Sequence, residues 1–81
     1  MNDVIVTFRS VTFAQRGEGV LRKAGIGCAL TRTQKNLEQR GCGYSLTLRA
    51  QDRQRAQALL EKEGVPYRKV YQTVGGTLRE L

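Results

Sequence analysis

The chain has 81 residues, of which 40% are hydrophobic, and this is enough apolar material for one small core but not for two. Fourteen lysines and arginines against seven acidic residues give a formal net charge of +7, which favours anionic partners. Histidine is absent, which excludes a Cys–His nucleophile pair and a His-containing metal site within one chain, and the two cysteines alone cannot complete a tetrahedral zinc site.

The N-terminal sequence MNDVIVTF has no basic region ahead of its apolar stretch. No apolar run approaches the roughly 18 residues that a membrane span requires. We therefore expect a cytoplasmic protein that does not enter a membrane, with both cysteines present as free thiols.

The first half of the chain predicts a strand, a helix and a second strand. Val4–Phe8 is apolar and β-branched, as strands are. Ser10 is a candidate N-cap for a helix that Gly25 is placed to end. The apolar face of this helix is expected to consist of Phe13, Gly17, Val20, Leu21 and Ala24. A short strand is expected at residues 27–31.

The second half predicts a polar loop at residues 33–40, followed by a strand, a helix and a last strand. Residues 44–49 alternate strictly between polar and apolar, which is typical of a half-buried strand. Asp52 is a candidate N-cap for the second helix, and Gly64 is placed to end it. The last strand is expected at residues 67–72.

The order β-α-β-β-α-β predicts an α+β fold, specifically a ferredoxin-like sandwich with two helices on one face of an antiparallel sheet of order 4-1-3-2. An internal repeat supports this arrangement, because residues 21–26 resemble residues 60–65. We expect a single ferredoxin-like domain at residues 1–73 and a flexible C-terminal tail at residues 74–81. The Gly75-Gly76 pair is followed by Thr77–Leu81, so we do not expect it to act as the terminal Gly-Gly of a ubiquitin-like sulfur carrier.

The topology also predicts where Cys42 lies. The first and third strands are expected to be antiparallel neighbours, so the end of the first lies beside the start of the third. Because Leu46 and Leu48 must face the helices, alternation places Tyr44 and Cys42 on the helix side as well. We therefore expect Cys42 to lie near Ser10, where the first helix begins.

This position favours a reactive thiol. A helix N-terminus carries a partial positive charge, and Arg9 or Arg40 would add a full one, so the pKa of Cys42 is expected to be lowered. Gly41 and Gly43 let the backbone turn tightly around the sulfur, and their N–H groups are candidates for holding an anion. The alternative is that Cys42 is a small residue tolerated between two turn glycines.

The second cysteine is interpreted differently. Cys28 alternates with Ile26 and Leu30 on an apolar face, so we expect it to be a small core side chain. An internal disulfide cycle with Cys42 is therefore not expected.

The sequence Arg40–Tyr44 resembles by its letters the RNA-contacting third strand of an RNA recognition motif. However, Cys42 stands where a stacking aromatic is needed, and Ile5 replaces the aromatic of the first strand. The expected alternation also turns these positions toward the helices. A small basic ferredoxin-like module that binds RNA or an anionic ligand, with a structural cysteine, remains the alternative function.

A further alternative is association of two copies through the open face of the sheet. This face is expected to be mixed in polarity, and nothing in the pattern prevents a homodimer from forming through it. Its residues are expected to be Ile5, Thr7, Ala29, Ser45 and Thr47, with Tyr67 and Tyr71 nearby.

Three short patterns resemble the family of selenium/sulfur carrier-like proteins along nearly the full length. They are Thr7-Phe8-Arg9-Ser10, the Cys42-Gly43 step into residues 44–46, and residues 60–65. The loop ahead of the cysteine departs from the family, because Thr33-Gln34-Lys35 lacks the usual proline and arginine.

The resemblance implies that Cys42 is a carrier thiol, holding sulfur or selenium as a persulfide or selenyl-sulfide between a donor and an acceptor protein. Gly41, Gly43, Arg9, Ser10 and Arg40 would then stabilise the thiolate or the bound anion. We expect a carrier rather than an enzyme, with no metal and no cofactor other than the covalently held atom.

Overall fold

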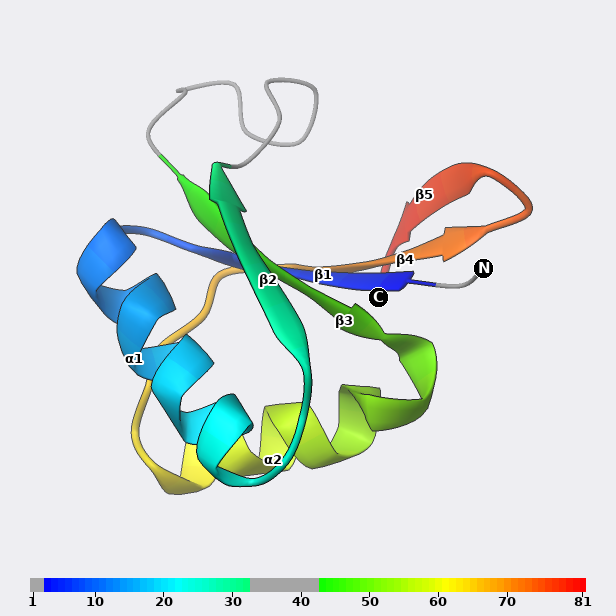
Figure 1. Ribbon diagram of the computed structural model, residues 1–81. Helices are drawn as coiled ribbons and strands as arrows, with labels where there is room; N and C mark the ends of the chain where they lie inside the picture. The colour runs from blue at the N-terminus through cyan, green and yellow to red at the C-terminus, as the bar shows by residue number, and fades with distance from the viewer. Residues whose placement is uncertain (1–2, 33–42) are drawn as a thin grey trace.

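The structure, a computed structural model, describes residues 3–32 and 43–81. Within these residues, two helices cover one face of a five-stranded antiparallel sheet (Figure 1). The elements are β1 (Asp3–Phe8), α1 (Val11–Lys23), β2 (Cys28–Arg32), β3 (Tyr44–Arg49), the 3-10 turn η1 (Ala50–Asp52), α2 (Arg53–Lys62), β4 (Val70–Val74) and β5 (Thr77–Glu80). The α+β class is therefore confirmed.

The strand order is β2-β3-β1-β4-β5, so β1 lies at the centre between β3 and β4. The prediction of a four-stranded sheet of order 4-1-3-2 differs from this sheet, because β5 extends it beyond β4. β5 is formed by residues predicted as a flexible tail. Gly75 and Gly76 have φ of 58° and 83°, and a two-residue type I′ hairpin requires positive φ at both positions. The hairpin pairs Val74 with Thr77.

Both helices end in the same way, which gives the internal repeat a physical basis. At the end of α1, the N–H of Gly25 donates to Arg22 O at 3.0 Å and that of Ile26 donates to Leu21 O at 2.9 Å. Gly25 has φ of 81°, so this is a Schellman motif ended by a left-handed glycine. The same two bonds follow α2, from Gly64 (φ 69°) and from the next residue.

The core lies between the sheet and the helices. The alternation predicted for β3 is confirmed, because Leu46 and Leu48 are buried on the helix side. The largest fully buried side chains are Phe8, Leu21, Ile26, Leu46, Leu60, Val4 and Val6. The sheet face opposite the helices carries Ile5, Thr7, Ala29, Ser45, Thr47 and Tyr71, as the register shows. A homodimer through this face stays a prediction.

Tyr67, which was predicted beside that open face, lies on the helix side instead. Arg68 and Lys69 both face Thr7: Arg68 N–H donates to Thr7 O at 2.8 Å, and Lys69 N–H donates to Thr7 Oγ1 at 3.0 Å. Arg68 and Lys69 thus lie opposite the single residue Thr7 and form a β-bulge. The bulge reverses the side of the sheet on which the preceding side chains lie. Consequently β4 begins at Val70, and the hydroxyl of Tyr67 donates to Glu61 Oε2 of α2 at 2.9 Å.

Candidate functional site

The predicted site residues divide into two groups. Cys42, Gly41 and Arg40 lie outside the described residues, whereas Gly43, Arg9 and Ser10 are described. Cys42 is bonded directly to Gly43, so Gly43 is the described residue that precedes β3 and adjoins the cysteine in the chain. We call Arg9, Ser10 and Gly43 together the corner.

Gly43 directly precedes β3, whose first residue pairs with the last residue of β1. The register pairs Phe8 with Tyr44, so Arg9 and Gly43 are the next residues beyond this pair on their own strands. Helix α1 begins two residues after Arg9. Gly43 is buried and Arg9 is exposed. The predicted meeting of the start of β3 with the end of β1 is therefore observed as far as the pair of Phe8 and Tyr44 (Figure 1).

The first turn of α1 is capped and carries no acidic residue. Ser10 Oγ accepts a hydrogen bond from Phe13 N–H at 3.3 Å, and Ser10 O accepts one from Ala14 N–H at 3.1 Å. The remaining N–H groups of the turn have no partner within the helix, and no carboxylate in the turn offsets the helix dipole. This helix end therefore favours an anion.

Further arginines lie at the same end of the sheet. Arg32, at the end of β2, pairs with Tyr44, and Arg68 donates its N–H to the residue before Phe8. Both side chains belong to exposed residues, as does Arg9. Neither Arg32 nor Arg68 was among the residues predicted for the site. The predicted sheet order could have placed Arg68 here, because a last strand that runs antiparallel to the first begins beside the end of the first.

Tyr44 is partly buried and packs against the core. It lies on the same side of β3 as Leu46, as alternation predicted. It is therefore not on the open face, where an RNA recognition motif presents its stacking aromatic side chains. The resemblance of this segment to such a motif is limited to its letters at this position.

Cys28 differs from a carrier thiol in its environment. It is half-buried on the edge strand β2, packs against the core, and its carbonyl accepts a hydrogen bond from Arg22 Nη2 at 2.9 Å. Burial raises the pKa of the Cys28 thiol above its ordinary value of 9.0, although the Arg22 charge partly opposes the shift. The thiol is therefore neutral at neutral pH, as suits a structural residue.

We expect Cys28 to react slowly with iodoacetamide at neutral pH. In a Cys42→Ser variant, the folded chain should be alkylated more slowly than the same chain in urea, because folding raises the thiol pKa. Because folding favours the neutral thiol, Cys28 contributes to the free energy of unfolding. This contribution is complete below the ordinary pKa of 9.0 and is lost as the pH rises through the pKa of the folded state. Equal alkylation rates in the folded and unfolded chains would contradict this assignment.

The cap at Ser10 can be tested by substitution. Ser10→Ala removes the acceptor for Phe13 N–H and should lower the free energy of unfolding by about 1 kcal/mol. Ser10→Asp is the matched control, because it keeps an N-cap acceptor and should retain the stability. Urea denaturation followed by circular dichroism measures both, and identical midpoints for Ser10→Ala and wild type would show that the cap is not used.

Comparison with known families identifies the chain. A family model described as "Putative Se/S carrier protein-like" matches residues 3–72, which include β1 to α2 and the Cys42-Gly43 step. The chain belongs to this family. No curated protein and no solved structure matches it.

Two structural findings accompany the family assignment. None of the described helices is both long and apolar enough to cross a membrane. Among the described residues of this Se/S carrier-like chain, no three His, Cys, Asp or Glu side chains are grouped so that they could hold a metal ion.

Proposed function

We propose that this chain carries a sulfur or selenium atom covalently on Cys42 between a donor and an acceptor protein. The observation that supports this most is the setting of Gly43, the neighbour of Cys42 in the chain. Gly43 directly precedes Tyr44, which pairs with Phe8, and Phe8 is followed by Arg9 and the capped, acid-free N-terminus of α1. Family membership gives the chemical class, and the corner supplies the positive charge that a thiolate needs.

The proposed loading step is an exchange between sulfur atoms. The Cys42 thiolate attacks the outer sulfur of a donor persulfide, R–S–SH, and a new S–S bond forms. The donor's own S–S bond breaks, and R–S⁻ leaves with the electron pair. Cys42 then holds the persulfide, and no external oxidant or reductant is consumed. A donor R–S–SeH would give the selenyl-sulfide in the same way.

Delivery is the reverse step with an acceptor thiolate as the nucleophile. It attacks the outer atom held on Cys42, and the Cys42 thiolate is the leaving group. A leaving thiol of low pKa departs faster, so the same positive corner assists both steps. The Gly43 N–H, the first turn of α1 and Arg9 are the groups that we propose to stabilise the anion.

A single-thiol mechanism fits the position of Cys28. Cys28 pairs with Leu48, which is five residues along β3 from Gly43, or about 17 Å at 3.4 Å per residue. A disulfide requires Cα atoms within about 7 Å. We therefore expect no disulfide between Cys28 and the residue that precedes Gly43, and the loaded atom would leave only to a partner.

The test is intact-mass spectrometry after incubation with a small-molecule persulfide donor. Wild type and Cys28→Ala should each gain the mass of one sulfur atom, which dithiothreitol should remove. Cys42→Ser should gain none. An unchanged mass in wild type, or the same gain in Cys42→Ser, would exclude Cys42 as the carrier thiol.

A further inference from the structure

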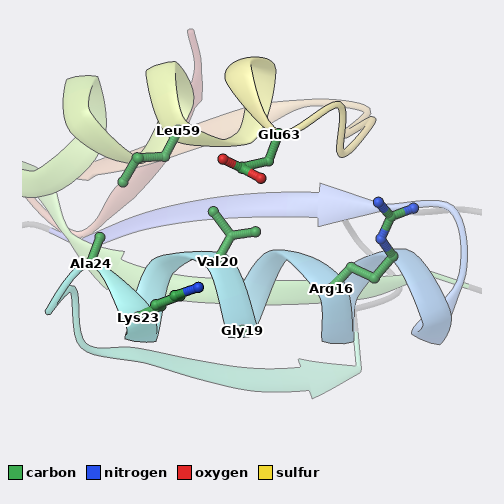
Figure 2. A pocket seen from close by; sticks show the side chains of 7 residues that line it. All are labelled: Arg16, Gly19, Val20, Lys23, Ala24, Leu59 and Glu63. Carbon is green, nitrogen blue, oxygen red and sulfur yellow. The ribbon is translucent and has the colours of Figure 1, made fainter.

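A shallow groove runs along the outer surface of the helix layer, between α1 and α2 (Figure 2). Its volume is about 430 Å³. Helix α1 contributes a stripe of residues at spacings i, i+3, i+4 and i+7, which share one helix face. On the other side of the groove, α2 contributes Leu59 and its C-cap residue Glu63, which are four residues apart. The lining residues are Arg16, Gly19, Val20, Lys23, Ala24, Leu59 and Glu63.

The groove has an apolar floor and a charged rim. Val20 and Leu59 are half-buried and pack against the core, whereas the charged residues at the rim are exposed. The side chains of Arg16, Lys23 and Glu63 make no ion pair or hydrogen bond within the part of the chain that the structure describes. Their charges therefore remain available to an external partner.

Gly19 is the second feature that points to an occupant. A Cβ added at Gly19 would meet nothing within 4 Å, so the packing of this chain does not require glycine there. Gly17, two residues earlier, is different, because a Cβ there would lie 3.0 Å from Phe8 Cζ. Glycine inside a helix is destabilising relative to alanine, yet it lets another backbone approach closely. Gly19 provides that close approach at the middle of the groove.

We propose that this groove binds an acidic amphipathic helix of a partner protein. Arg16 and Lys23 are seven residues apart, which is two helical turns or about 10.5 Å. A partner helix with two carboxylate side chains seven residues apart matches this spacing. Small apolar side chains between them would pack against Gly19 and the floor, and a basic side chain would pair with Glu63. The proposal does not depend on Cys42.

The same residues argue against two other occupants. Four of the seven lining residues are exposed, so the groove is too open to enclose most of a small molecule, as ligand pockets do. A second copy packed across a two-fold axis at Gly19 would set Arg16 against Lys23 of the other copy. This like-charge contact disfavours a homodimer through the groove.

The experiment uses a fluorescent synthetic helix of about 18 residues, or five turns, built from alanine and leucine with two glutamates seven residues apart and one lysine. Anisotropy titration should show binding to wild type and at least about tenfold weaker binding of the same peptide with glutamine in place of glutamate. Gly19→Ala and Arg16→Glu should each weaken binding about tenfold or more. Gly19→Ala should also raise the melting temperature, so loss of folding cannot explain its effect.

Two matched variants serve as controls. Gly27→Ala changes another exposed glycine at which an added Cβ meets nothing within 4 Å, and Arg49→Glu makes the same charge change as Arg16→Glu at an exposed residue of β3. Both should bind the peptide as wild type does. Equal loss in these controls, or equal binding of the glutamine peptide, would overturn the proposal. So would a dimer in light scattering that Gly19→Ala disrupts, or single-stranded RNA that binds this groove in preference to the peptide.

Discussion

Phe8→Ala is expected to lower the free energy of unfolding by about 3–5 kcal/mol. Phe8 is 0% exposed, and its ring fills the space above Gly17 in α1. Its backbone pairs with Tyr44 across the central strands. Removal of the ring leaves a cavity where β1, β3 and α1 meet. A small domain has a total stability of only about 5–15 kcal/mol, so this one substitution removes much of it.

Urea denaturation measures the Phe8 effect. Phe8→Leu, which retains part of the volume, should lose clearly less than Phe8→Ala and keeps the comparison valid if the alanine variant does not fold. Val11→Ala is the surface control, because Val11 is 37% exposed, and its stability should change by no more than about 0.5 kcal/mol. A loss for Phe8→Ala as small as that for Val11→Ala would show that the ring is not part of the core.

The second large effect concerns two glycines of α1 that are only two residues apart. Gly17→Leu should destabilise the chain by about 1–3 kcal/mol, because even its Cβ would lie 3.0 Å from Phe8 Cζ and 3.2 Å from Leu46 Cδ1. Gly19→Ala should instead stabilise it by about 1 kcal/mol, since open space surrounds that position and alanine favours the helix.

Thermal and urea denaturation of these variants check the opposite signs. A double variant, Phe8→Ala with Gly17→Leu, adds a sharper test, because the leucine would occupy part of the volume that the ring vacates. Its loss of stability should be smaller than the sum of the two single losses. Strict additivity would mean that Phe8 and Gly17 do not share one packing site.

Much of the fold could be predicted because local chemistry and tertiary packing agree. The alternation of Leu46 and Leu48 fixed the inward face of β3, since a shift by one residue would expose both. Ser10 predicted the start of α1, and Gly25 its end, because each residue supplies a conformation or acceptor that the helix terminus needs. Asp52 precedes α2 as predicted, but it makes no side-chain capping bond.

The errors have identifiable physical causes. The bulge at Arg68 and Lys69 depends on the hydroxyl and carbonyl of Thr7, which is more than sixty residues away, so local alternation could not reveal it. It moved Tyr67 to the helix side. The β4–β5 hairpin, in contrast, had a local signal, because Gly75-Gly76 separates two alternating segments as a type I′ turn does.

Prediction of the candidate site was limited in a different way. The proximity of Arg9, Ser10 and Gly43 was predicted from the antiparallel pairing of the first and third strands, and that pairing is observed up to Phe8 and Tyr44. The groove between the helices could not be predicted in this way, because Gly17 and Gly19 look alike in the sequence. Only the positions of Phe8 and Leu46 show that the first glycine is required by packing and the second is not.

Transfer of one isotopically labelled sulfur atom is the most direct test of the proposed carrier function. A donor persulfide carrying the label in its outer sulfur is incubated with the chain, excess donor is removed, and an acceptor thiol is added. We expect wild type and Cys28→Ala to deliver the label to the acceptor, whereas Cys42→Ser should deliver none. Equal delivery by Cys42→Ser, or label that wild type retains in the presence of the acceptor, would contradict this expectation.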